Sequence, residues 1–165
     1  RLLDELSLDQ PINIKLSAHK IQFNCPKFTI TSKLIEGTFP DYAAVIPQNN
    51  NVIASINRPE FIKAVELVTI ATEQRTSGIK LLFENNKLTL SASNSNNFAG
   101  KRQLEIDYNG NNLELGFNPR YLLDVAGTIN SENMLFLLNN QSSPILVKHP
   151  ENEQQLFLVM PMRVV

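Results

Sequence analysis

Cysteine is nearly absent from this chain of 165 residues, which contains only Cys25. A single thiol cannot form an internal disulfide framework, and this usage fits a reducing compartment such as the cytosol. Nothing in the sequence around Cys25 indicates an activated thiol. We therefore expect Cys25 to be a buried structural residue.

Long apolar runs and blocks of one charge are also missing. No apolar segment approaches the roughly 20 residues that cross a bilayer, and no basic and apolar leader indicates secretion. The formal net charge is −1, which gives no argument for nucleic-acid binding and none against a few locally placed cations. The composition, 42% hydrophobic and 19% charged, is typical of a globular domain that buries a core.

Motifs for catalysis and metal binding are absent from the sequence. The six glycines are scattered through turns, so no phosphate-binding loop or nucleophile elbow is formed. His19 and His149 have no cysteine or carboxylate at a metal-ligand spacing. Glu66 and Glu73 share one face of a predicted helix, where a solvated surface explains them. We therefore predict a protein that is not an enzyme and that binds no metal or cofactor.

The chain before residue 52 has two parts of different character. Apolar and polar residues alternate in three segments, which predicts half-buried antiparallel strands at residues 12–16, 19–23 and 28–31. Residues 1–6 resemble the end of a helix without an initiator Met, so we expect a piece of a longer polypeptide. Two prolines and a glycine then indicate a connector, but its large apolar side chains predict that it packs against another surface.

A repeated order of elements follows. Asn57 and Asn118 are predicted N-caps, each followed within two residues by a proline, for helices over residues 58–74 and 119–129. The first helix should bury the face containing Phe61, Ala64, Val65, Val68, Ala71 and Thr72. The Asn109-Gly110 pair predicts a tight hairpin turn. Strands are predicted at residues 52–56, 79–83, 87–91, 101–108, 113–117, 134–138, 145–148 and 156–160.

Side by side, these elements form three copies of one unit of strand, helix, strand, strand, strand, of which the N-terminal copy lacks its first strand and most of its helix. The predicted fold class is α+β, with antiparallel sheets on one side and helices on the other. Residues 1–35 would be the last part of an incomplete domain. Residues 36–51 would be the connector, and residues 52–165 a complete domain of two units.

Two surface features leave alternatives open on sequence alone. The C-terminal run continues past Pro161, which cannot donate to a sheet ladder, into Met162 and Arg163. It either completes a sheet or ends as an exposed docking surface. Arg58 and Lys63 lie on the outward side of the first predicted helix, which either contacts phosphates or is plainly solvated.

Several motifs resemble one known family. They are LIEGTFPDY at residues 34–42 with VIP at 45–47, GFN at 116–118 with YLLDV at 121–125, and VMPMR at 159–163. In this order and spacing they resemble the bacterial DNA polymerase III β subunit, the sliding clamp. The resemblance covers the whole chain, from the last part of the middle domain to the end of the C-terminal domain.

The resemblance implies a non-catalytic processivity factor of bacterial replication. Members of this family form a head-to-tail homodimeric ring around duplex DNA, with helices on the inner wall and sheets on the outer wall. They are cytoplasmic and nucleoid-associated rather than membrane-bound. The implied partners are duplex DNA without sequence preference, the polymerase III α subunit, the clamp-loader δ subunit, and other polymerases and repair proteins that dock through short linear motifs.

The resemblance also implies a set of site residues. Arg58 and Lys63 are the candidates for facing DNA. The chain departs from many relatives at Ala43-Ala44, where a basic pair is common, and at residues 98–102, which are basic where some relatives have carboxylates at the ring-closing face. The residues implied to surround the partner-peptide pocket are Pro40, Val45, Asn118, Tyr121, Val159, Met160, Pro161, Met162 and Arg163.

Two hypotheses follow. The first is a sliding clamp that encircles DNA and serves as a mobile docking platform. The alternative is a freestanding protein-interaction domain of the same fold that does not encircle DNA.

Overall fold

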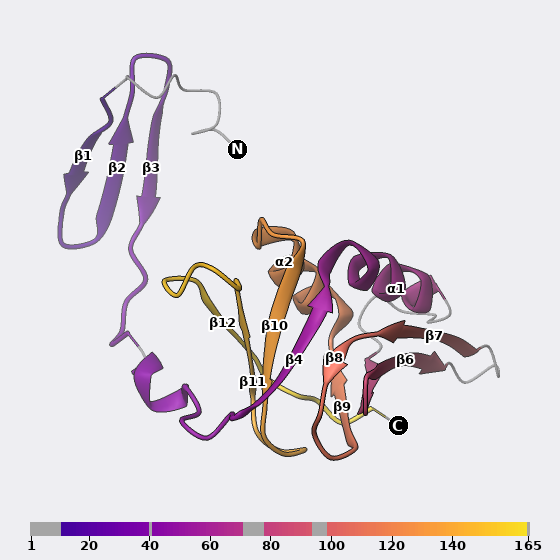
Figure 1. The fold of residues 1–165 in the computed structure, drawn as a ribbon. Helices are drawn as coiled ribbons and strands as arrows, with labels where there is room; N and C mark the ends of the chain where they lie inside the picture. Colours follow the sequence, from indigo (N-terminus) through magenta and orange to yellow (C-terminus); the bar gives the residue numbers. More distant parts are fainter. Residues whose placement is uncertain (1–10, 40, 71–77, 94–98, 165) are drawn as a thin grey trace. The chain divides into compact units, whose positions relative to one another are not determined.

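The structure, a computed structural model, describes residues 11–39, 41–70, 78–93 and 99–164 (Figure 1). The chain divides into two compact units, Arg1–Asp41 and Tyr42–Val165. The boundary between them lies inside the segment predicted as a connector. Within the described residues, neither α-helix has the length and apolar character required to cross a membrane.

The first unit contains a meander of three antiparallel strands. They are β1 (Asn13–Leu16), β2 (Lys20–Asn24) and β3 (Thr29–Lys33), which confirms the three predicted strands with ends shifted by one or two residues. Cys25 follows β2 and is buried, as expected. Its backbone N–H donates to the carbonyl of Phe28 at 2.9 Å, which closes the turn before β3.

The second unit begins with the 3-10 helix η1 (Tyr42–Val45) and a short polar segment. Asn50 of this segment is only 6% exposed. Its side-chain amide donates to the carbonyls of Leu137 at 2.9 Å and Pro144 at 2.8 Å. Because these bonds satisfy partly buried carbonyls, Asn50 fixes the end of the connector to the strands that follow.

The second unit then repeats one order of elements. This confirms the predicted repeat and the α+β class. The first copy is β4 (Val52–Asn57), α1 (Arg58–Ile70), β5 (Ile79–Glu84), β6 (Lys87–Ser93), β7 (Ala99–Glu105) and β8 (Asp107–Tyr108). The second copy is β9 (Leu113–Phe117), α2 (Pro119–Thr128), β10 (Asn133–Leu138), β11 (Ile145–Lys148) and β12 (Leu156–Val159).

Each sheet takes the first strand of the opposite copy. One sheet has the order β12-β11-β10-β4-β8 and the other β7-β6-β5-β9. Thus β4 pairs with β10 of the second copy, and β9 pairs with β5 of the first. The two copies are interlocked, since neither completes a sheet from its own strands.

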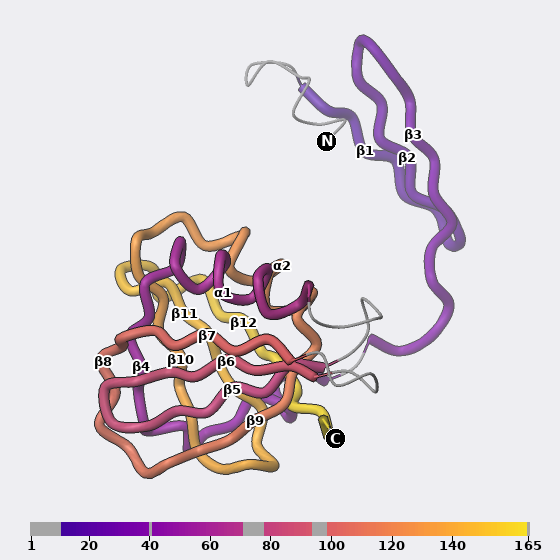
Figure 2. The backbone as a smooth tube through the Cα atoms, turned by 90° about the vertical axis from the view of Figure 1, so that its right-hand side faces the viewer, coloured from indigo at the N-terminus to yellow at the C-terminus, as the bar shows by residue number. Residues whose placement is uncertain are grey.

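Both helices lie on one side of the sheets (Figure 2). The predicted caps are present. The Asn57 side-chain oxygen accepts from the N–H of Glu60 at 3.1 Å, and that of Asn118 accepts from the N–H of Arg120 at 2.9 Å. Helix α1 buries Phe61, Ala64, Val65 and Val68, as predicted. Ala71, Thr72 and the predicted helix end at residue 74 lie outside the described residues.

The predicted hairpin at Asn109-Gly110 is wrong. The segment predicted as one strand at residues 101–108 is divided at Ile106 into β7 and β8. β8 belongs to the other sheet, where it pairs with β4. Gly110 does not have a positive φ, so no primed turn forms. The Tyr108 hydroxyl instead donates to the carbonyl of Asn111 at 2.6 Å. Burial of Tyr108 and Ile106 outweighs the local turn preference.

One hydrophobic core lies between the sheets and the helices. Phe61 of α1 meets Phe136 of β10 edge-to-face, with ring centroids 5.4 Å apart. Phe83 of β5 lies 6.3 Å from Phe136 and 5.7 Å from Tyr108. These four rings are at most 2% exposed, and aromatic pairs at such distances stabilise a core beyond the area they bury. They connect both sheets to α1.

Replacing Tyr108 with Phe should change how stability depends on pH. Burial raises the pKa of the Tyr108 phenol above its ordinary value of 10.0. The phenol's contribution to the free energy of unfolding is therefore complete below pH 10.0 and decreases as the pH rises through the raised folded-state pKa. Urea unfolding across this pH range measures the effect. At neutral pH, Tyr108→Phe should have a free energy of unfolding about 1 kcal/mol lower than the wild type, because it loses the hydrogen bond to Asn111. The free energy of unfolding of Tyr108→Phe should also decrease less than that of the wild type as the solution becomes alkaline. Equal alkaline slopes for both proteins would contradict this.

Candidate functional site

The last strand and the tail beyond it run from one sheet to the other. β12 pairs with β11 along its length and forms an edge of its sheet. The ladder ends at Val159, two residues before Pro161, whose ring nitrogen has no proton to donate. The backbone N–H of Met162 then donates to the carbonyl of Gly116 in β9 at 2.8 Å. The tail from Met162 to Val164 accordingly lies beside β9 (Figure 2), so β12 completes its sheet and the chain then crosses to the other sheet.

Helix α2 presents a set of side chains towards β12. Asn118 caps the helix and Pro119 occupies its first turn, which fixes the position of the first residues. Tyr121, Asp124 and Val125 follow at helical spacings of three and four, so they share a face. Contacts between α2 and β12 place this face beside the end of the last strand.

A cavity of about 310 Å³ lies between α2 and the end of β12. Val159 is 3% exposed and belongs to the core, whereas Tyr121 and Met160 are 57% and 60% exposed. The cavity therefore has an apolar wall set into the core and large, accessible side chains at its opening. It is lined by Tyr121, Asp124, Val125, Leu158, Val159 and Met160.

Three of the implied pocket residues meet in this cavity: Tyr121, Val159 and Met160. Asn118 lies at the start of the same helix, but its side-chain oxygen is already used as the cap. Its amide NH₂ group leaves donors for a ligand. A contact between Asn118 and a partner peptide therefore stays a prediction.

Among the described residues, Val45, Pro161, Met162 and Arg163 do not line the cavity. Val45 lies on η1 and is 55% exposed, and Pro40 lies outside the described residues. Pro161 is half-buried, and Met162 and Arg163 are exposed on the tail. The tail residues thus continue away from the cavity towards β9.

Asp124, Val125 and Leu158 also line the cavity, although sequence reasoning did not select them. Asp124 and Val125 lie three and four residues after Tyr121, so the helical period alone could have indicated them. Leu158 directly precedes Val159, and its side chain is partly buried. Only the packing of α2 against β12 shows that Leu158 reaches the cavity.

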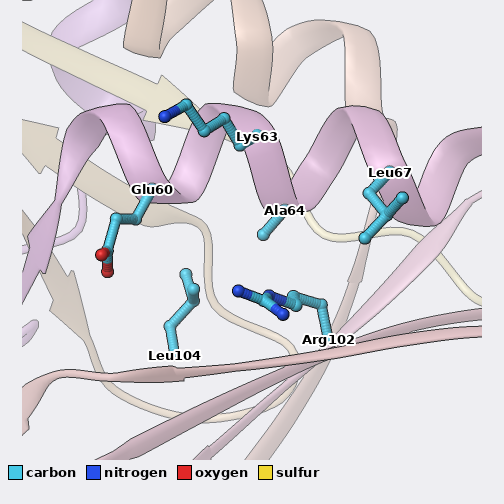
Figure 3. Close-up of a pocket in the computed structure, with 6 residues that line it drawn as sticks. All are labelled: Glu60, Lys63, Ala64, Leu67, Arg102 and Leu104. Atoms are coloured by element: carbon cyan, nitrogen blue, oxygen red, sulfur yellow. The ribbon is translucent and has the colours of Figure 1, made fainter.

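A second groove, of about 360 Å³, lies between α1 and β7. Figure 3 shows Glu60, Ala64 and Leu67 of α1 above Leu104 and Arg102 of β7, with the Lys63 ammonium extending away from the strand. β7 is an edge strand, so this groove runs along an accessible sheet edge.

The two cations predicted to face DNA differ in their surroundings. Lys63 is exposed. The Arg58 guanidinium donates from Nε to the carbonyl of Ser131 at 2.7 Å and from Nη1 to that of Ala126 at 3.3 Å. Arg58 thus links α1 to the end of α2, which leaves fewer of its donors for a phosphate.

No cluster of three or more metal-binding side chains occurs in the part of the chain that the structure describes. His149 uses its ring Nδ1 to accept from the N–H of Glu151 at 3.0 Å, which stabilises the bend after β11. The cavity beside α2 has an apolar wall with the Tyr121 hydroxyl and the Asp124 carboxylate beside it, a lining that suits an apolar ligand with a few polar groups.

Solved structures similar to this chain are bacterial sliding clamps. A clamp from Pseudomonas aeruginosa, solved with a ligand, matches with a TM-score of 0.88 and 36% identity, over 99% of this chain and 44% of that one. A clamp from Bartonella birtlesii, solved bound to griselimycin, matches with a TM-score of 0.85 and 39% identity, over 93% and 41%. The fold is that of a DNA-clamp domain.

The curated relatives of this chain are also sliding clamps. The Beta sliding clamp of Pseudomonas aeruginosa is 37% identical over 164 residues, covering 99% of this chain and 44% of the relative. That of Caulobacter vibrioides is 35% identical over 158 residues, covering 96% and 42%. The chain thus spans less than half the length of these relatives. Residues 43–163 match the family described as DNA polymerase III beta subunit, C-terminal domain, and the chain belongs to this family.

Removing the cap of α2 should destabilise the helix that contains Tyr121. Asn118→Ala should lower the free energy of unfolding by about 1 kcal/mol, because the N–H of Arg120 loses its acceptor, whereas Asn118→Ser should retain most of the cap. Urea unfolding of both variants tests this. Equal stability of Asn118→Ala and the wild type would contradict the capping role.

Proposed function

We propose that this chain is the C-terminal part of a bacterial sliding clamp, a processivity factor that encircles duplex DNA and docks replication proteins. Family membership and the fold support this proposal. Residues 1–35 are proposed as the end of the middle domain, residues 36–51 as the connector and residues 52–165 as the C-terminal domain. The chain spans less than half the length of its relatives. Ring formation and partner binding are therefore proposed for the full-length protein.

The cavity between α2 and β12 is the observation on which the docking function depends. Its wall of Val125, Leu158 and Val159 suits one apolar anchor, such as a Leu or Phe of a short linear motif. Met160 is unbranched and polarizable, so it can adapt to anchors of different shape. The Tyr121 hydroxyl and the Asp124 carboxylate provide polar groups that would orient the bound peptide.

Several partners can share such a site in turn. The proposed partners are the polymerase III α subunit, the clamp-loader δ subunit, and other polymerases and repair proteins. Val45, Asn118 and the tail from Pro161 to Arg163 are proposed as the border of the site, together with Pro40. The proposed role is non-catalytic, and the proposed location is the cytoplasm, on the nucleoid.

DNA would be held without reading its sequence. In the proposed ring, α1 and α2 face the duplex, and Lys63 with the remaining donors of Arg58 contact phosphates. Such contacts supply salt-dependent affinity rather than sequence preference. A net charge near zero is compatible with a ring that slides, because a few cations limit the strength of phosphate binding.

The groove along β7 is proposed as the ring-closing contact in the full-length homodimer. An edge strand offers backbone donors and acceptors to a second chain. Lys101 and Arg102 are exposed on this strand, and Leu67 adds apolar surface beside it. We propose that this edge meets a carboxylate-bearing edge of a second copy.

Truncating the pocket side chains should weaken peptide binding by the full-length protein. Tyr121→Ala and Met160→Ala should each raise the Kd of a fluorescent Gln-Leu-x-Leu-Phe-type peptide by about tenfold or more, because each removes a side chain that would contact the peptide's apolar anchor. Deletion of residues 160–165 should abolish binding. Fluorescence polarisation measures all three.

Ile53→Ala is the matched control, because Ile53 is a similarly exposed apolar residue, at 52%, that does not line the cavity. Its Kd should equal that of the wild type. No binding by the wild-type protein, or binding that survives the deletion, would refute the docking site. A docking protein that is not retained on circular DNA would instead favour the freestanding interaction domain.

Charge reversal on β7 should weaken self-association of the full-length protein. Arg102→Glu should raise the dimer dissociation constant by about tenfold, because it places like charges at the proposed contact. Arg120→Glu changes the same charge on exposed α2 and should leave dimerisation intact. Analytical ultracentrifugation compares them, and an unchanged dimer for Arg102→Glu would exclude an ionic contribution here.

A further inference from the structure

The tail after Pro161 rests on two glycines. A Cβ at Gly116 would collide with the backbone oxygen of Met162 and lie 2.5 Å from a Val164 methyl carbon. A Cβ at Gly78 would collide with the same Val164 methyl and lie 3.2 Å from the Met162 sulfur. Real Cβ atoms essentially never approach other atoms within 3.0 Å, so the tail occupies space that a side chain at either position would fill.

The two glycines lie on the same face of their sheet. Gly116 of β9 faces Lys80 of β5 in the strand register, and Gly78 precedes Lys80 by two residues. Since side chains alternate along a strand, Lys80 and Gly116 point the same way. A Cβ at Gly78, one residue before β5, would meet the same Val164 methyl as a Cβ at Gly116. Ile79 and Phe117 point the other way and are fully buried, so the tail lies on the face away from the core.

Neither glycine is required for its own backbone conformation. In the described residues, Gly37 is the glycine with a positive φ, so Gly78 and Gly116 adopt backbone angles open to other residues. The space that the tail occupies is what demands glycine at these positions. This separates them from turn glycines, which are needed for φ.

Met160 lies between two anchored points of the backbone. On one side, Val159 is the last residue of the β11–β12 ladder, opposite Ile145. On the other side, Met162 donates to the carbonyl of Gly116 at 2.8 Å. Pro161, whose φ is fixed, joins Met160 to Met162. The packing of the tail against the glycines therefore determines the position of Met160 at the cavity.

We propose that Gly78 and Gly116 are positioning residues of the docking cavity, which hold the tail and thereby the Met160 wall in place. The inference rests on the proposed docking function. It adds that the shape of the cavity depends on residues in the opposite sheet that do not line it. A side chain at either position would displace the tail and open the Met160 side of the cavity.

The two positions should respond differently to a second substitution. At Gly78 the nearest obstacle is the side chain of Val164, which Val164→Ala removes. At Gly116 the nearest obstacle is the backbone oxygen of Met162, which no side-chain substitution removes. Val164→Ala should therefore rescue Gly78→Ala but not Gly116→Ala, a coupling that a double-mutant cycle detects.

The test uses the full-length protein and the fluorescent peptide. Gly116→Ala should raise the peptide Kd at least about tenfold, equivalent to ~1.4 kcal/mol. Gly78→Ala should raise it less, and Gly78→Ala with Val164→Ala should return it to the value of Val164→Ala alone. Methyl signals of Met160 and Met162, assigned by substitution in nuclear magnetic resonance spectra, should shift in Gly116→Ala, whereas that of buried Met134 should not.

Two control variants separate positioning from general destabilisation. Gly127→Ala adds a Cβ on α2 that meets nothing within 4 Å, so it should change neither the Kd nor the tail signals. Gly110→Ala places a Cβ 2.5 Å from the Tyr108 hydroxyl, far along the chain from the tail. It should lower the thermal midpoint and leave the Kd unchanged.

The outcomes distinguish this proposal from the docking function. Wild-type protein that does not bind the peptide overturns the docking function, and the methyl signals still report whether the glycines hold the tail. Wild-type binding with an unchanged Kd and unchanged methyl signals in Gly116→Ala overturns the positioning role alone. Equal rescue of both glycine variants by Val164→Ala would overturn the proposed geometry.

Discussion

Phe83 of β5 and Phe136 of β10 belong to different sheets, and their rings lie 6.3 Å apart in the core. Phe61 of α1 packs against Phe136 from the helix side. Each sheet contains a strand from the opposite copy of the repeat. The contact between these rings therefore holds both copies together. Separating the sheets would expose the large buried aromatic surface, whose burial is a main stabilising contribution to a domain of this size. This packing holds the two sheets and α1 together.

The candidate docking cavity depends on both sheets. Its helix, α2, follows β9 of one sheet, whereas β12 is an edge strand of the other. The tail then returns to β9, where Met162 bonds to Gly116. A site with walls from two sheets keeps its shape only while the sheets remain packed. In the proposed clamp, this rigidity pre-organises the site for short peptides that must themselves become ordered on binding.

Local signals predicted the elements whose causes are local. Asn57 and Asn118 were predicted as caps because each supplies a side-chain acceptor at a helix start, and the structure places both there. The buried face of α1 followed from its period. The Asn109-Gly110 hairpin failed because β8 pairs with β4 in the other sheet. A turn signal describes only a few residues, and burial of Tyr108 in a distant core overrides it.

The sequence by itself determined the repeat, the fold class and the family, because period, capping and motif order are properties of neighbouring residues. It also indicated Tyr121, Val159 and Met160, which the motifs of the resemblance contain. Only the tertiary structure decided that Leu158 reaches the cavity and that the tail leaves β12 for β9. These features depend on the space between segments that are far apart in the chain. The sequence shows a glycine at residue 116, but only the structure shows that the backbone of Met162 occupies the place of its side chain.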